Sequence, residues 1–153
     1  MGIYEKKLAE EGITLPDAPA PAANYVPYVL VGNVLYVSGQ ISQNSSGLIL
    51  GKLGDSLTTD QGAEAAKFRA ISLLAQVKSA CEGDLDKLGR VIKLTGFVNS
   101  TPEFTQQPMV INGASDLMGS VLGEAGKHAR VAVSANSLPL GVAVEIDGIF
   151  QIA

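Results

Sequence analysis

The sequence predicts an α+β protein in which one mixed β-sheet carries two helices on one of its faces. Its 153 residues are enough for one domain and too few for two full domains. With 46% hydrophobic and only 17% charged residues, the composition is that of a globular chain rather than a disordered or fibrous one. Strand and helix patterns then follow in the order hairpin, helix, strand, helix and two strands, which favours a sheet with helices packed on one face.

The N-terminal segment differs in composition from the rest of the chain. Residues 3–12 have a short helical pattern that ends at Gly12, and the Pro- and Ala-rich stretch after it cannot continue a helix. We expect a helix and linker over residues 1–24 and the folded domain over residues 25–153. The charged residues near the N-terminus do not fit a signal peptide, and Cys81 has no partner for a disulfide, so we expect a cytoplasmic location.

A β-hairpin is predicted next. Two β-rich runs, residues 25–31 and 34–38, are joined by Gly32-Asn33, a pair that suits a two-residue turn. The uncharged stretch 18–51 is interrupted by Pro27 and by Gly and Asn residues, so it is expected to be buried β structure and not a membrane span. Residues 41–57 are rich in Ser, Asn and Gly and predict a loop with at most one edge strand.

The strongest helical signal starts at Thr58 or Thr59 and continues to about Glu82. Thr58 and Gln61 have the spacing of a capping box, and Gly83 is a plausible C-terminal stop. The buried stripe is expected to comprise Ala66, Ala70, Leu73, Leu74, Val77, Ala80 and Cys81. A second helix is predicted over residues 109–123, and strands over residues 91–98, 129–135 and 142–152.

With both helices on one face, the other face of the sheet is left uncovered. Residues such as Val131, Val133, Val142 and Val144, or their neighbours, would lie on that face. A largely uncharged sheet face is usually covered by another subunit. We therefore expect a homo-oligomer.

Most of the usual catalytic and cofactor-binding patterns are missing from the sequence. His128 is the single histidine, and neither a nucleophile elbow, a P-loop nor a dinucleotide-binding glycine motif occurs. One His and one Cys do not form a zinc site, so no metal and no cofactor is expected. The net charge of −4 offers no general attraction to nucleic acids or anionic membranes. Cys81 lies on the apolar side of the long helix and is expected to be a packed, inert thiol.

Two charges, Arg130 and Glu145, lie inside the last two predicted strands. If these strands form an antiparallel pair that turns over residues 136–139, the register that faces Val133 with Val142 also faces Arg130 with Glu145. Such a pair has two interpretations, a structural ion pair or a ligand site, and the sequence leaves both open. In the second interpretation, the planar arginine fork matches a carboxylate and the glutamate orients or deprotonates water.

Several short motifs follow one another between about Tyr25 and Ile152. They are Pro27-Tyr28-Val29, Gly32-Asn33, Val37-Ser38-Gly39-Gln40-Ile41, Phe97-Val98, Ala129-Arg130, Leu138-Pro139 and Val144-Glu145-Ile146. In order and approximate spacing this set resembles the RidA/YjgF family, also called L-PSP endoribonuclease-like proteins. The resemblance implies the YjgF or chorismate-mutase-like fold and a homotrimer with a central barrel and three ligand clefts between subunits.

The resemblance also implies an activity and its residues. Archetypal members hydrolyse 2-aminoacrylate and related imines or enamines to 2-keto acids and ammonia without a cofactor. Arg130 then resembles the arginine that grips the substrate carboxylate, and Glu145 the glutamate that holds the attacking water. The other residues that resemble positions of the cleft are Tyr28, Ser38, Gly39 and, as a weaker match, Asn112.

The chain departs from the family pattern at two positions beside Arg130. Ala132 stands where the family has a cysteine, and His128 stands where a proline is usual. His128 is expected either to contact the substrate or, more in keeping with a single histidine, to lie at the surface or in an interface. Tyr28 has a second interpretation as an ordinary strand aromatic.

Three functions are left by these observations. The first is an imine deaminase, the second a carboxylate-binding trimer without turnover, and the third an endoribonuclease. The acidic balance and the absence of a basic-aromatic stripe make the third the weakest. Retention of Glu145 favours the first, because attack by water needs a positioned base.

Overall fold

The computed structural model describes residues 1–20, 24–41, 43–44 and 46–153. Within these residues the helices are α1 (Ile3–Glu10), α2 (Thr59–Ala80) and α3 (Gln107–Leu122), with short 3₁₀ helices η1 (Leu85–Lys87), η2 (Gly123–Gly126) and η3 (Pro139–Gly141). The strands are β1 (Tyr28–Val31), β2 (Val34–Ile41), β3 (Gln43–Asn44), β4 (Gly47–Leu48), β5 (Leu88–Asn99), β6 (Ala129–Ala135) and β7 (Val144–Ile152).

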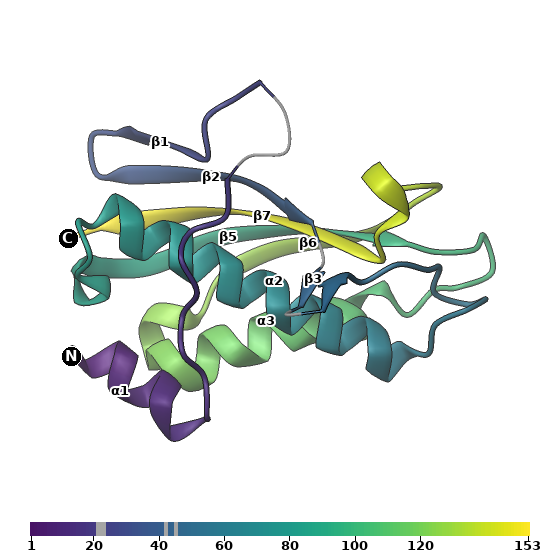
Figure 1. Cartoon of the computed structure of the whole chain (residues 1–153), viewed down its shortest axis with the longest axis horizontal. Helices are drawn as coiled ribbons and strands as arrows, with labels where there is room; N and C mark the ends of the chain where they lie inside the picture. Colours follow the sequence, from purple (N-terminus) through teal and green to yellow (C-terminus); the bar gives the residue numbers. More distant parts are fainter. Residues whose placement is uncertain (21–23, 42, 45) are drawn as a thin grey trace.

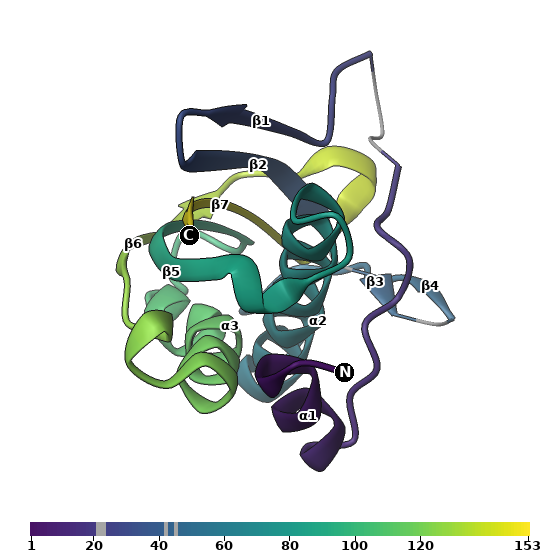
Figure 2. The same cartoon turned by 90° about the vertical axis from the view of Figure 1, so that its left-hand side faces the viewer.

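The main sheet is mixed, and its strand order is β1-β2-β7-β5-β6. β5 and β6 run parallel, while the other neighbours are antiparallel. Helices α2 and α3 pack side by side on one face of this sheet, and none of the three α-helices in the described residues lies on the other face (Figures 1 and 2). The expected α+β class with two helices on one face is therefore confirmed. The strands β3 and β4 form a separate small hairpin in the region where at most one edge strand was expected.

Helix α2 forms as its sequence predicts. The Thr58 hydroxyl accepts a hydrogen bond from the Gln61 backbone N–H at 3.2 Å, and the Gln61 side-chain oxygen accepts one from the Thr58 backbone N–H at 2.9 Å. These two bonds are the predicted capping box, and they satisfy donors that a helix N-terminus leaves free. Of the predicted stripe, every member is buried except Ala80, which is half-buried. The stripe packs against the sheet as part of one hydrophobic core.

Helix α1 packs onto the same core. Leu8 is fully buried in it, and the Asp86 carboxylate accepts hydrogen bonds from the backbone N–H groups of Ile3 at 2.8 Å and Tyr4 at 3.1 Å. Asp86 therefore supplies the N-terminal cap that the sequence of α1 lacks. Lys78 of α2 adds a salt bridge to Glu5 at 2.8 Å.

The predicted hairpin between the last two strands is wrong. β6 and β7 do not pair with each other, because β5 lies between them. Arg130 pairs with Leu94 and Glu145 with Phe97, so the register that faced Arg130 with Glu145 does not exist. The physical reason is the crossover β5–α3–β6, which returns the chain parallel to β5 and leaves β7 to insert between β2 and β5.

The face of the sheet opposite the helices, here called the open face, is partly apolar. Val131 and Val133 are each 40% exposed and Tyr36 is 48% exposed. Val142 and Val144, which were also expected on this face, are fully buried instead. No helix in the described ranges is both long and apolar enough to cross a membrane.

Candidate functional site

Arg130 lies on β6, the edge strand of the sheet, and its side chain reaches helix α3. Its Nη1 donates to the Ser115 hydroxyl at 3.1 Å, and its Nη2 donates to the Pro108 carbonyl at 3.2 Å. Within the part of the chain that the structure describes, no carboxylate forms a salt bridge with Arg130. Since a guanidinium has five N–H groups, these two bonds orient the side chain and leave three N–H groups for a ligand.

Two further polar side chains, Asn112 and His128, belong to the surroundings of Arg130 and Ser115. Asn112 is exposed, four residues after Pro108 and three before Ser115, so it lies on the same stripe of the helix. The Ser115 hydroxyl also lies 2.9 Å from Nε2 of His128. Sequence reasoning missed Ser115, since only the packing of α3 against β6 brings it to residues 13 and 15 positions further along the chain.

Glu145 lies on β7 and points to the open face. A Cβ atom on Gly39 would come within 3.2 Å of its carboxyl carbon, so a glycine at that position makes room for the glutamate side chain. Burial raises the pKa of the Glu145 carboxyl, and the neighbouring Asp147 raises it further. The pKa of Asp147 is raised as well, mainly by burial, although a hydrogen bond from Thr95 lowers it in part. The open face therefore holds two carboxyls whose ionisation is disfavoured.

Tyr28 and Ser38 form their side-chain hydrogen bonds with groups other than Arg130 and Glu145. Tyr28 pairs with the buried Val37, and its hydroxyl lies 3.4 Å from the Ser79 hydroxyl of α2, so it faces the helices. The Ser38 hydroxyl donates to the Val26 carbonyl at 2.8 Å. Of the residues proposed for the cleft, one chain thus brings Gly39 to Glu145 and Asn112 to the surroundings of Arg130.

The two charged residues lie on opposite faces of the sheet. Arg130 shares its side with Leu94, whose buried side chain packs in the core below the helices. Glu145 pairs with Phe97, which also pairs with the exposed Val133 on the open face. A single chain therefore holds the candidate cation at its β6 edge and the candidate carboxylate on its open face, and does not bring them together.

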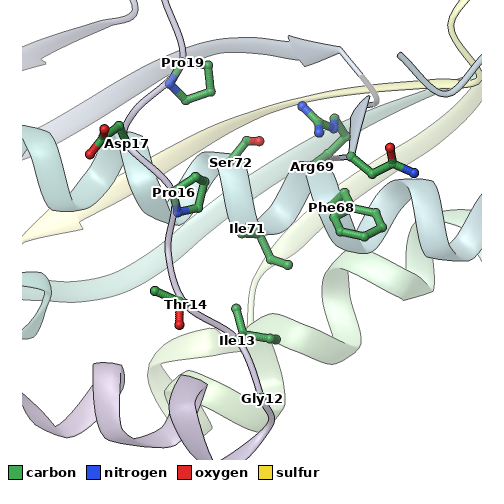
Figure 3. Close-up of a pocket in the computed structure, with 11 residues that line it drawn as sticks. Gly12, Ile13, Thr14, Pro16, Asp17, Pro19, Phe68, Arg69, Ile71 and Ser72 are labelled. Atoms are coloured by element: carbon green, nitrogen blue, oxygen red, sulfur yellow. The ribbon is translucent and has the colours of Figure 1, made fainter. Parts of the chain in front are cut away.

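Two hollows lie elsewhere, beside the N-terminal linker. The larger, about 490 Å³, lies between the linker and α2, with Ile13 and Pro16 on one side and Phe68 and Ile71 on the other (Figure 3). The smaller, about 190 Å³, is lined partly by the backbone turn at residues 38–41. Neither is lined by Arg130 or Glu145.

A buried polar stripe of α2 borders both hollows, and sequence reasoning missed it. Arg69 is only 2% exposed and lines both of them, and burial lowers its pKa to about 10. Gln76 is also buried and donates to the Pro19 carbonyl of the linker at 2.6 Å. The linker covers this stripe, which explains how polar residues are accommodated on an inward side of the helix.

Neither metal nor thiol chemistry is built into the described residues. They contain no group of three or more His, Cys, Asp or Glu side chains that could hold a metal ion. Cys81 is buried, and burial raises the pKa of its thiol. A thiol in such surroundings is a poor nucleophile, so the expectation of a packed cysteine is confirmed.

Comparison with known proteins places these features in a family context. Residues 5–147 match the family model described as "YjgF/chorismate mutase-like, putative endoribonuclease". Protein TCP17 of Trypanosoma cruzi is 51% identical over 99% of this chain and 95% of its own length. The crystal structure of Atu1372 from Agrobacterium tumefaciens, a protein of unknown function, is 50% identical, with a TM-score of 0.92 over 99% of this chain and 93% of that one. RidA from an Antarctic Psychrobacter species is 26% identical, with a TM-score of 0.55 over 89% of this chain and 94% of that one.

Proposed function

The chain belongs to the YjgF/chorismate mutase-like family, and on this basis we propose that it hydrolyses reactive 2-imino acids to 2-keto acids and ammonia. Enamino acids such as 2-aminoacrylate are substrates through their imine tautomers. The reaction consumes one water, forms a C=O bond at the imine carbon and releases the nitrogen as ammonia. It needs no oxidant or reductant, and the residues proposed below supply binding and proton transfer.

The observation that carries this proposal is the presentation of Arg130. A half-buried guanidinium on a rigid strand, oriented by two neutral acceptors and with N–H groups to spare, suits a small carboxylate. A bidentate contact there would fix the position of the adjacent imine carbon. Orientation of this kind lowers the barrier for attack by water on an imine that is already electrophilic.

Glu145 is the proposed base for that water. A carboxylate whose pKa is raised accepts a proton more readily than that of an ordinary glutamate. In the proposed step its carboxylate takes a proton from water as the oxygen attacks the imine carbon. The protonated glutamate returns this proton to the nitrogen, which gives a carbinolamine. The hydroxyl proton then passes to the nitrogen through the same glutamate, the C–N bond breaks, and ammonia leaves as the C=O bond forms.

Because Arg130 and Glu145 lie on opposite faces of one chain, the proposed site forms between two copies. The open face, with its exposed Val131 and Val133 and the Glu145 carboxyl, would be covered by another subunit. The β6 edge of one copy would then supply Arg130 to a cleft whose glutamate belongs to the next. A closed ring of three copies is the assembly that the family resemblance implies, and it would provide three such clefts.

A carboxylate-binding protein without turnover is the second candidate. The observation that favours it is the same separation, since Arg130 alone suffices for binding whereas hydrolysis needs Glu145 as well. The endoribonuclease activity in the family description has less support here, because the net charge is −4.

A coupled assay tests the proposal. An amino acid oxidase generates imines from several amino acids, and the imine remaining after a fixed time is trapped with semicarbazide. Wild type is expected to accelerate the loss of imine, and Arg130→Ala is expected not to. Arg90→Ala is the matched control, because Arg90 likewise donates to a backbone carbonyl, that of Lys127 at 2.8 Å. If no imine disappears faster with wild type than without protein, the hydrolase is excluded, and binding of the 2-keto acid then decides for the second candidate.

A further inference from the structure

A chain of hydrogen bonds links the single histidine to Arg130. His128 Nδ1 lies 2.6 Å from the Gly126 carbonyl oxygen, and its Nε2 lies 2.9 Å from the Ser115 hydroxyl. The same hydroxyl accepts from Nη1 of Arg130 at 3.1 Å. Ser115 is thus the bridge between an imidazole and the proposed carboxylate-binding guanidinium.

The chemistry of the partners fixes the direction of these bonds. A carbonyl oxygen only accepts, so Nδ1 carries the hydrogen that is donated to Gly126. In the neutral ring Nε2 is then the acceptor, and the Ser115 hydroxyl donates to it. This turns the lone pairs of the Ser115 oxygen toward Arg130, the direction in which the guanidinium needs an acceptor.

We propose that His128 is a positioning residue that acts through Ser115 on Arg130 and makes the binding of a carboxylate depend on pH. The proposal rests on the proposed function only in taking Arg130 as the carboxylate-binding group. It assigns a role to the position at which this chain departs from the family pattern.

Protonation of His128 changes the state of the bridge. Both ring nitrogens then donate, so the Ser115 oxygen receives hydrogen bonds from two cations, which repel each other. A carboxylate bound to Arg130 offsets this repulsion. By linkage, binding of the carboxylate favours uptake of a proton by His128, and a lower pH favours binding of the carboxylate.

Other charged groups lie near His128. They are Arg130 on β6, Lys127, which precedes His128 and forms an ion pair with Glu124 of η2, and Arg90 on β5, which donates to the Lys127 carbonyl. Lys93 of β5 acts on Asp147 at the open face, and Asp116 of α3 lines a hollow against α2. Glu145 and Asp147 have raised pKa values and contribute a pH dependence of their own from the open face. The histidine variant separates the two contributions.

The first test measures binding of 2-oxobutanoate, which stays ionised throughout, by calorimetry at about pH 8 and about pH 5.5, on either side of the ordinary range of histidine. For wild type we expect about tenfold tighter binding at the lower pH, because a nearby charge of opposite sign changes the protonation equilibrium of a histidine by about this factor. In His128→Gln the difference in affinity between the two pH values should be smaller than in wild type, because only the contribution of Glu145 and Asp147 is left. Ser115→Ala should weaken binding about fivefold, the value of one hydrogen bond, and Ser115→Thr should restore it.

The outcomes separate the two proposals. Wild type that binds no 2-keto acid at either pH contradicts Arg130 as the carboxylate-binding group, and with it the proposed function. Wild type that binds, with an unchanged pH profile in His128→Gln, overturns the role of His128 and leaves the proposed function intact.

A second test needs no ligand. Nitrogen-15 spectra of the one imidazole in the chain, recorded at about pH 8, report which ring nitrogen carries the hydrogen. The proposed link from His128 through Ser115 to Arg130 requires the Nδ1–H tautomer. Observation of the Nε2–H tautomer would overturn this link, because Ser115 would then not donate to the ring.

Discussion

At the scale of single residues, the proposed function depends on how Arg130 is held. Its two acceptors are neutral, so no buried ion pair is broken when it is removed. This separates its effect on activity from its effect on folding. It also removes one interpretation of the Arg130 and Glu145 pair, the structural ion pair within one chain, since among the described residues the two form no salt bridge.

Replacement of Arg130 should therefore abolish activity at small cost in stability. We expect Arg130→Ala to lower kcat/KM for imine hydrolysis about 100-fold, the loss of a charge-assisted bidentate contact. The free energy of unfolding should fall by about 1–2 kcal/mol, the value of two ordinary hydrogen bonds. Arg130→Lys should recover part of the binding but not the bidentate geometry. Steady-state kinetics and urea unfolding measure both, and a loss of activity that merely follows unfolding would contradict the role of Arg130.

Glu145 should reduce stability at neutral pH. Its pKa in the folded chain is raised, so folding favours the protonated form, and stability is lost as the pH rises through the folded value. We expect Glu145→Gln to raise the thermal midpoint at pH 7, and the gain to vanish at a pH below the ordinary range of glutamate. Glu64→Gln, on the exposed side of α2, is the control. A gain that is equal at both pH values would mean that burial does not disfavour the charge.

At the scale of elements, the close packing of α2 and α3 sets where Ser115 and Pro108 stand. A Cβ atom on Gly113 of α3 would overlap the Ala63 carbonyl oxygen of α2, whereas a Cβ on Gly119 meets no atom within 4 Å. The two glycines share one helix and differ only in what faces them. They provide a matched pair for testing the packing.

We expect opposite effects from alanine at these two positions. Gly113→Ala should destabilise the fold by about 2–3 kcal/mol, because the helices must move apart. Gly119→Ala should stabilise it by about 0.5–1 kcal/mol, because alanine is the better helix former. Chemical unfolding of both variants measures this, and equal effects would mean that the helices do not pack this closely.

Local patterns predicted most of the elements, and the pairing of strands was where they failed. The capping box of α2, the Gly32-Asn33 turn and the strand over residues 129–135 depend on neighbours in sequence, and each is present. The partner of β6 depends on the whole sheet. Treating the last two strands as a hairpin overlooked that the strand–helix–strand order before them already favours a parallel partner, β5.

The candidate site was predictable only in part, for the same reason. Arg130 and Glu145 could be singled out because charges within apolar strands are uncommon. Ser115 is an ordinary helix serine in the sequence, and only the crossover brings it to Arg130 and His128. Arg69 was missed because its burial depends on the linker that covers α2, a contact between segments that carries no local signal.

At the scale of the whole molecule, the apolar open face should hold copies of the chain together. We expect light scattering at micromolar concentration to give three times the 15.8 kDa of one chain. Val133→Asp should lower this mass, because it places a charge on the open face beside the proposed acidic half of the site. Ile3→Lys changes another exposed apolar residue, on α1, and should leave the mass unchanged. A wild-type mass of one chain would contradict the shared site.

The central claim is that Arg130 of one copy and Glu145 of another complete a single site. It is tested most directly by mixing Arg130→Ala and Glu145→Gln chains, each inactive alone, through joint unfolding and refolding. In a randomly mixed assembly, a site is intact when its glutamate comes from an Arg130→Ala chain and its arginine from a Glu145→Gln chain. With equal amounts of the two chains this holds for about one site in four, so we expect about a quarter of wild-type imine hydrolysis to return. Mixed assemblies that form but stay inactive would contradict a site shared between subunits.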